Sequence, residues 1–159
     1  MDLDRLYREQ APRARGLAYL LTGDRRLAED LVHDCFATLA GRLRPVSDPE
    51  AYLRRMVVNA CHSHHRRIRV RRQRAADEAL VVGADTDTSA DGTDDRAERS
   101  RLLAALAMLP PRQREAVVLR HWLDLPESEV AALLGCSVGT VKSLASRGRA
   151  ALRLVLEDA

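Results

Sequence analysis

The stretch "LLGCSVGTVKSLASRGRAAL", residues 133–152, has the pattern of a turn that leads into a long amphipathic helix. Gly135 can adopt the positive φ of a sharp turn, and Ser137 can cap the helix that follows it. Ala131, four residues before the glycine, is small enough for two helices to cross closely. Apolar residues at helical spacing predict the seam between these helices: Val130, Leu134, Val138, Val141 and Leu144. Together these features predict a helix-turn-helix, with Ala145 and Gly148 leaving room for a further helix.

The outer side of the second helix is small and polar. It carries Ser137, Thr140, Lys142, Ser143, Ser146 and Arg147. In the major groove of DNA, short hydroxyl groups can bond base edges, and two long cations can reach phosphate or guanine. The alternative interpretation is an ordinary helical hairpin with a solvated face. The spacing of Ala131, Gly135 and Val141 favours the DNA-binding interpretation.

The composition favours helices along the whole chain. Of 159 residues, 46% are hydrophobic but only 3% are aromatic, so any core consists mostly of Leu, Val and Ala. We find neither an alternating strand pattern nor a repeat. The predicted fold class is therefore all-α, with enough apolar residues for one domain or two small ones.

Three helices are predicted in the first 76 residues. Asp24 is a favoured N-cap for the second helix, Pro45 and Pro49 interrupt the chain after it, and Ser47 or Asp48 can cap the third. The positions expected to be buried are Leu6, Leu17, Leu20 and Leu21 in the first helix, Leu27, Leu31, Val32, Cys35, Phe36, Leu39 and Leu43 in the second, and Leu53, Met56, Val57 and Ala60 in the third. Four further helices are predicted after residue 96. One of them ends at Pro110 and the next begins at Pro111, a favoured first-turn residue.

Charge is distributed unevenly, although the net charge is only +3. Residues 48–76 carry 8 basic and 2 acidic groups, whereas residues 77–95 carry 7 acidic groups and no basic one. The acidic stretch contains "LVVGADTDTSADGTDD", residues 80–95, which has no periodicity and predicts a flexible linker. The predicted organisation is a helical domain at 1–76, an acidic linker at 77–96 and a second helical domain at 97–159.

The third predicted helix is strongly basic. Eight arginines and no acidic residue lie between Arg54 and Arg74. One side of the helix presents a cationic stripe at i, i+4, i+7 and i+11, made of Arg55, Asn59, His62 and Arg66. Such a stripe is a candidate surface for nucleic acid, with Tyr52 as the aromatic side chain of this helix.

Several other functions are disfavoured. No apolar run is long enough for a membrane span, and the charged N-terminus lacks the apolar segment of a signal peptide, so we expect a cytoplasmic protein. Cys35, Cys61 and Cys136 fit neither a disulfide framework nor a metal site. Neighbouring histidines on one helix diverge, so His62, His64 and His65 do not predict a metal site either. We find no nucleophile–base pair and no phosphate loop, and expect no enzyme activity and no cofactor.

Two segments together resemble a known family. They are "LTGDRRLAEDLVHDCF", residues 21–36, and "LPPRQREAVVLRHWLDLPESEVAALLGCSVGTVKSLASRGRAAL", residues 109–152. The pairing resembles the extracytoplasmic-function (ECF) group of sigma-70 factors, of the actinobacterial SigE-like type. These are bacterial transcription initiation subunits that have only the domains called region 2 and region 4.

The resemblance implies specific partners and sites. Region 2 would dock on the β′ clamp helices of core RNA polymerase through Glu29, Asp30, His33 and Asp34. The loop at residues 44–48 resembles the segment that captures a flipped base of the −10 element. The −10 DNA would be held by Arg54, Arg55, Asn59, His62 and Arg66. Region 4 would read the −35 element through Lys142, Ser143, Ser146 and Arg147 and would contact the β flap. An anti-sigma factor is a further expected partner.

The chain also departs from the family pattern. A tryptophan common before the −10 loop is absent from "ATLAGRL", residues 37–43. Leu144 stands where many members have arginine. The base preferences of those members are therefore not expected to apply to this chain.

Two other functions remain open from the residues alone. A helix-turn-helix regulator could bind DNA without polymerase, usually as a dimer on a palindrome. A receiver domain of such a regulator would need βα alternation, which the first 76 residues lack. A polymerase-docking inhibitor would have no use for the arginines from Arg54 to Arg74.

Overall fold

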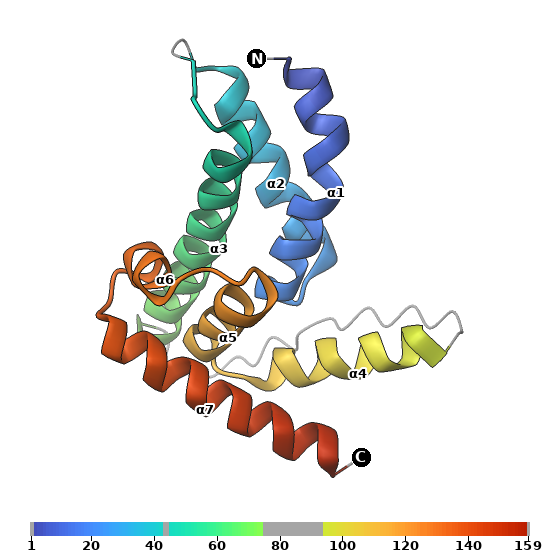
Figure 1. Ribbon diagram of the computed structural model, residues 1–159, viewed down its shortest axis with the longest axis vertical. Coiled ribbons are helices and arrows are strands. Elements are labelled where there is room, and N and C mark those ends of the chain that lie inside the picture. The colour runs from blue at the N-terminus through green and yellow to red at the C-terminus, as the bar shows by residue number, and fades with distance from the viewer. Residues whose placement is uncertain (1, 43–44, 75–93, 159) are drawn as a thin grey trace. The chain divides into compact units, whose positions relative to one another are not determined.

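The computed structural model describes residues 2–42, 45–74 and 94–158, and the regular elements of these segments are all helices (Figure 1). The described residues contain no strand, which confirms the predicted all-α class. None of their helices is long and apolar enough to cross a membrane. The chain divides into two compact units, residues 1–87 and 88–159. The acidic stretch predicted as a linker lies almost wholly outside the described residues.

The first unit is a bundle of three helices that all pack on one another. They are α1 (Leu3–Thr22), α2 (Arg25–Ala40) and α3 (Pro49–Arg74). Gly23 ends α1 with a φ of 70°, and Asp24 then caps α2 by accepting from a backbone N–H of its first turn at 3.1 Å. Asp48 caps α3 in the same way at 3.1 Å. The predicted breaks and caps of this unit are therefore confirmed, with Asp48 taking the position that the sequence left open between Ser47 and Asp48.

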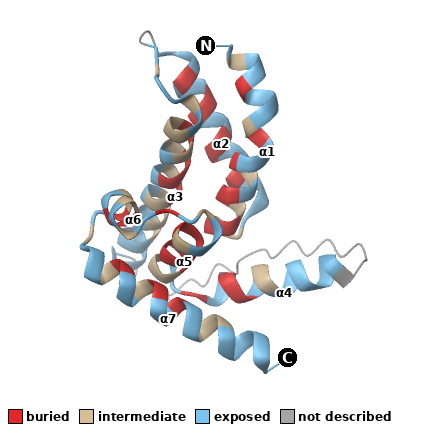
Figure 2. Ribbon diagram, viewed as in Figure 1, coloured by how far each residue is buried: buried red, intermediate tan, exposed pale blue. Residues whose placement is uncertain are grey.

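The core of the first unit follows most of the predicted apolar positions (Figure 2). Confirmed as buried are Leu6, Leu17, Leu20 and Leu21 on α1, Leu31, Val32, Cys35, Phe36 and Leu39 on α2, and Leu53 and Val57 on α3. Leu27 is half-buried, and Leu43 lies outside the described residues.

The predicted core face of α3 is partly wrong. Met56 and Ala60 are only half-buried, whereas Val58 and Cys61 are fully enclosed. The reason is that α3 packs against both α1 and α2. The positions of two neighbours therefore decide which side of α3 is covered. That side keeps Leu53 and Val57 but is rotated toward Val58 and Cys61 relative to the face that periodicity alone favours.

The second unit places two short helices against a long one. Its elements are α4 (Asp94–Met108), α5 (Pro111–Val117), the π-helical turn η2 (Val118–Trp122), α6 (Glu127–Leu134) and α7 (Val138–Glu157). Because α4 begins at Asp94, it includes the last three residues of the range predicted as linker. The long helix α7 packs on α4, α5 and α6. Asp124 has a φ of 53° and turns the chain from η2 toward α6.

Candidate nucleic-acid interface

The turn between α6 and α7 has the geometry predicted for a helix-turn-helix. Gly135 ends α6 with a φ of 65°, and its N–H donates to Ala131 O. Ser137 caps α7, and its Oγ accepts from the N–H of Thr140 at 3.1 Å. The hydroxyl groups of Ser137 and Thr140 also lie 2.9 Å apart and share a hydrogen bond. Both residues are thus used in shaping the N-terminus of α7.

The inner face of α7 holds the helix against α5 and α6. Val141 is fully buried, as are Val130 and Leu134 across the seam on α6. Two other predicted members of the seam are less enclosed, because Leu144 is half-buried and Val138 is 39% exposed. Val138 is the first residue of α7. The predicted seam is therefore correct at its centre and wrong at Val138.

Small residues let α5 approach α7, as the sequence predicts. Ala145 and Gly148 are buried on α7. A Cβ atom added to Gly148 would lie 2.5 Å from Val117 Cγ2 and 3.2 Å from Gln113 O, both on α5. No side chain fits there without displacing α5.

The outer face of α7 is left free by this packing. Five of the six residues predicted to face DNA are exposed: Ser137, Lys142, Ser143, Ser146 and Arg147. The sixth, Thr140, is half-buried. The structure therefore gathers on one side of α7 the two cations and two of the free hydroxyl groups that the sequence predicts for base and phosphate contacts.

One of these cations has a partner on the preceding helix. Lys142 Nζ lies 3.6 Å from Glu127 Oε2, and Glu127 is the first residue of α6. An exposed pair of this kind contributes little to stability. It does draw the ammonium group toward α6, and sequence reasoning missed it because the two residues are 15 positions apart.

Two arginines of the second unit are structural. Arg114 is 7% exposed, and it donates from Nε to Leu106 O at 2.7 Å and from Nη2 to Ala107 O at 2.8 Å. It thereby binds the carbonyl groups at the C-terminus of α4. Burial lowers the pKa of the Arg114 guanidinium, and the neighbouring carboxylate of Glu115 opposes this effect. Arg120 Nη1 donates to Leu125 O at 2.6 Å and so supports the loop before α6.

The cationic stripe of α3 is present on the surface of the first unit. One turn of an α-helix takes 3.6 residues, so Arg55, Asn59, His62 and Arg66 fall within an arc of about 60°. Arg55, Asn59 and Arg66 are exposed, and His62 is half-buried. Arg54, which was predicted to act with them, is half-buried and lies about 110° from the centre of this arc.

The aromatic residue of α3 is covered on one face. The Arg42 guanidinium lies over the ring of Tyr52 at 4.4 Å from its centroid. A base that stacked on this face would have to displace Arg42. Sequence reasoning missed this contact, since Arg42 lies just after the end of α2. Arg44, in the predicted base-capturing loop, lies outside the described residues.

The outer side of α2 is acidic. The four residues predicted to meet polymerase are all exposed: Glu29, Asp30, His33 and Asp34. They alternate with the buried residues Leu31, Val32 and Cys35, which explains why packing leaves them on one side. Within the described segments, none of these three carboxylates forms an ion pair.

The histidines of α3 lie outside any cluster of metal ligands within the described segments. Among those residues there is no group of three or more His, Cys, Asp or Glu side chains that could hold a metal ion. The rings of His64 and His65 meet edge to face, with centroids 6.2 Å apart. Burial, followed by the charges of His65 and Arg67, lowers the pKa of His64.

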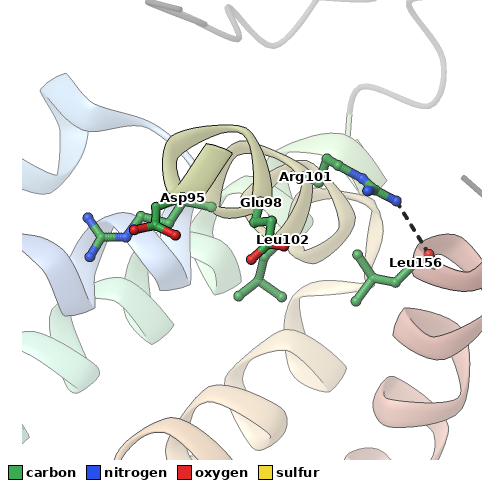
Figure 3. Close-up of a pocket in the computed structure, with 6 residues that line it drawn as sticks. Asp95, Glu98, Arg101, Leu102 and Leu156 are labelled. Carbon is green, nitrogen blue, oxygen red and sulfur yellow. Dashed lines mark hydrogen bonds between the residues drawn. The ribbon is translucent and has the colours of Figure 1, made fainter. Parts of the chain in front are cut away.

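A hollow of about 520 Å³ separates α4 from the end of α7 (Figure 3). It is lined by Asp95, Glu98, Arg99, Arg101, Leu102 and Leu156. Arg101 Nη2 bridges it by donating to Leu156 O at 3.4 Å. Most of the lining is exposed and of mixed charge, so the hollow offers no set of groups aimed at one ligand.

Each of the two units matches a known protein family. The sigma-70 region 2 family model matches residues 6–72, and the sigma-70 region 4 model matches residues 99–152. The RNA polymerase sigma-E factor of Streptomyces antibioticus is 38% identical over 133 residues, which cover 82% of this chain and 71% of that protein. The ECF RNA polymerase sigma factor EcfG of Rhodopseudomonas palustris is 32% identical over 148 residues, covering 91% of this chain and 80% of the relative. The chain belongs to the ECF group of RNA polymerase sigma factors.

A solved structure supports the same conclusion for the fold. The sigma factor RpoE from Bartonella quintana, in complex with the anti-sigma factor NepR, matches this ECF sigma factor with a TM-score of 0.70. The two are 26% identical, and the match covers 98% of this chain and 97% of the other. In this ECF sigma factor, the region 2 match contains the acidic side of α2 and the stripe of α3, and the region 4 match contains the helix-turn-helix.

Proposed function

We propose that this sigma factor binds core RNA polymerase in the cytoplasm and directs it to promoters, without catalysing a reaction itself. The observation that carries the proposal is the outer face of α7, where Lys142, Ser143, Ser146 and Arg147 stay exposed opposite a buried seam. Residues 1–76 act as region 2, residues 97–159 as region 4, and residues 77–96 as the acidic linker.

Region 4 reads the −35 element with the N-terminal half of α7. Lys142 and Arg147 reach phosphate or guanine, and Ser143 and Ser146 let the backbone approach the base edges. Ser137 and Thr140 orient the end of the helix through their shared hydrogen bond. This unit also contacts the β flap of polymerase.

Region 2 holds the −10 element along α3. Arg55, Asn59 and Arg66 contact the DNA, and His62 lies between them on the same arc. Arg54 lies beside the stripe and not on it, since it is half-buried and about 110° from the centre of the arc. Flipping a base out of the stack costs a few kcal/mol, which these contacts offset.

The acidic side of α2 is the polymerase-binding surface of region 2. Glu29, Asp30, His33 and Asp34 are exposed together, and their carboxylates are available to cations on the β′ clamp helices. An anti-sigma factor, as in the complex of the Bartonella relative, would regulate the chain by binding in competition with polymerase.

Run-off transcription with core polymerase tests the proposal. We expect promoter-specific transcripts from the intact chain and none after Asp30→Arg combined with Asp34→Arg, because the reversed charges repel the clamp. Helicity measured by circular dichroism should be unchanged, since both side chains are exposed. Co-purification of the folded double variant with core polymerase at the parent's yield would exclude the acidic side of α2 as the docking surface.

Transcription and DNA binding together separate the rival functions. Loss of −35 binding in Lys142→Ala and Arg147→Ala, together with transcription by the parent, supports the sigma function. A parent chain that binds DNA as a dimer but never supports run-off transcription would instead be a helix-turn-helix regulator.

A further inference from the structure

A carboxylate lies beside the outer face of α7. Lys142 Nζ is 3.6 Å from Glu127 Oε2, and the side chains of Lys142 and Glu127 are 64% and 32% exposed. Glu127 is the first residue of α6, which packs on α7 (Figure 1). Lys142 is the single lysine of the chain, since every other member of its 26 Lys and Arg residues is arginine. The pair thus joins the one lysine of the proposed DNA face to an opposite charge on the neighbouring helix.

Stability does not explain why a carboxylate occupies this position. An exposed ion pair contributes little, because solvent screens the two charges. A carboxylate in the first turn of a helix is favoured by the helix dipole, but Glu129 also supplies such a charge to α6. A negative charge beside a surface that meets phosphates weakens binding to DNA. The presence of Glu127 is therefore better explained by its effect on Lys142.

Pairing with Glu127 changes which contacts Lys142 can make. Affinity that is independent of sequence arises when cations neutralise phosphates and release counterions. A lysine whose charge is already balanced by a carboxylate contributes little to that release. Its ammonium group has three N–H donors, and one carboxylate oxygen occupies at most one of them. Two donors remain for O6 and N7 of a guanine, which lysine can bind together.

The location of Lys142 on α7 gives it a choice between these contacts. Lys142 and Arg147 lie at opposite edges of the outer face, about 140° apart round the helix. From an edge, the flexible side chain of lysine can reach the phosphates that border the groove as well as the bases within it. Among the described residues, Arg147 forms no ion pair with a carboxylate. Glu127 therefore distinguishes the two cations of this face.

We propose that Glu127 determines specificity in region 4 by withholding Lys142 from the phosphate backbone. The donors of Lys142 are then reserved for a guanine of the −35 element. Glu127 acts through Lys142 and is thus a positioning residue. The inference rests on the proposed function for its choice of DNA, and it assigns a part in base recognition to α6, outside the outer face of α7.

The test compares Glu127→Gln with Glu129→Gln in the full-length chain. Both variants lose one negative charge from α6, and the two positions lie about 160° apart round the helix. Each protein is mixed with a library of duplexes whose central segment has a random sequence, and the bound DNA is sequenced. Affinity for a duplex of mixed sequence is measured separately as a function of salt.

We expect Glu127→Gln to weaken the preference for guanine at one position. The preference should fall by about three- to tenfold, which is part of the roughly five- to 150-fold discrimination that a bidentate contact provides. Log K for the mixed duplex should depend on log salt more steeply, by up to about 0.9, because one more phosphate is neutralised. Glu129→Gln should keep the parent's base preference and salt slope.

A double variant identifies the group through which Glu127 acts. In a Lys142→Ala background, Glu127→Gln should change neither the base preference nor the salt slope, because the cation that it would release is missing. An equal loss of preference in that background would overturn the proposal. Glu127 would then read a base itself, as a carboxylate does when it accepts from N4 of cytosine.

The assay needs no polymerase, so it separates the role of Glu127 from the sigma function. A parent that selects a sequence but fails in run-off transcription still supports the role of Glu127 if Glu127→Gln weakens the selection. Identical selection by the parent and Glu127→Gln refutes that role alone. A parent that selects no sequence refutes the reading of DNA by α7 and this inference together.

Discussion

At the scale of single residues, Gly148 shows how closely the second unit is packed. Its missing side chain leaves room for Val117 and for the backbone at Gln113. We predict that Gly148→Ala destabilises the second unit by about 1–3 kcal/mol, because α5 must move away from α7. The measurement is urea unfolding followed by fluorescence of Trp122, which is the single tryptophan of the chain and lies in this unit.

Gly16 provides the matched control. It lies inside α1, it is exposed, and a Cβ atom added there meets nothing within 4 Å. Gly16→Ala should therefore stabilise the first unit by up to about 1 kcal/mol through helix propensity alone. If Gly148→Ala unfolds at the parent's midpoint, the close approach of α5 and α7 is not a constraint on stability.

The pair of Glu127 and Lys142 leads to a second prediction at this scale. We expect Glu127→Gln to strengthen binding to −35 DNA by a few-fold, because it removes a carboxylate near the phosphates and releases Lys142. Fluorescence anisotropy with duplex DNA at several salt concentrations measures the effect. The gain should shrink in a Lys142→Ala background, and a gain of equal size there would show that Lys142 is not the group released.

At the scale of elements, α4 depends on a side chain from the next helix. Arg114 donates to the carbonyl groups of Leu106 and Ala107 at the end of α4, where Leu106 O also accepts from the backbone N–H of Leu109 at 3.1 Å. We predict that Arg114→Met destabilises the second unit by about 1–3 kcal/mol, since it removes two hydrogen bonds from a charged donor to the end of α4. In this variant, amide hydrogen exchange should show that α4 loses protection before the other helices of the second unit.

Arg112→Met is the control for this prediction. Arg112 lies on the same helix and is half-buried, but the side chain that donates to the carbonyl groups of Leu106 and Ala107 is that of Arg114. Its replacement should leave exchange in α4 unchanged. Equal protection of α4 in the Arg114 and Arg112 variants would mean that the helix is held by its apolar contacts alone.

At the scale of the whole molecule, the two units are expected to act jointly. Neither basic surface neutralises many phosphates alone, so tethering both on polymerase raises the effective concentration of the second contact. We predict that cleavage at a protease site placed at residues 84–90 abolishes run-off transcription at low protein concentration. If the cleaved chain transcribes as well as the intact one, joint action through the tether is wrong.

The acidic charge of the linker is tested separately. Because α4 begins at Asp94, the replacement by neutral Gly and Ser is limited to residues 85–93. Full activity would indicate a plain tether. Loss of initiation with promoter binding intact would indicate that the negative charge acts within polymerase.

Local signals explain why so much of the fold could be predicted. Asp24 and Ser137 cap their helices, Gly135 adopts positive φ, and Pro111 begins α5, because each effect acts within about four residues of chain. The exposed face of α7 could also be predicted from local spacing. A buried seam at Val130, Leu134 and Val141 leaves only the opposite side of the helix free.

The sequence alone thus determined the helices, their ends and the residue types on each side of them. Only the tertiary structure decided which side of α3 is enclosed, because two neighbouring helices cover Val58 and Cys61 rather than Met56 and Ala60. The same holds for the roles of Arg114 and Arg42 and for the pairing of Lys142 with Glu127. Each depends on contacts made between elements, and periodicity within one helix carries no information about the neighbour that it meets.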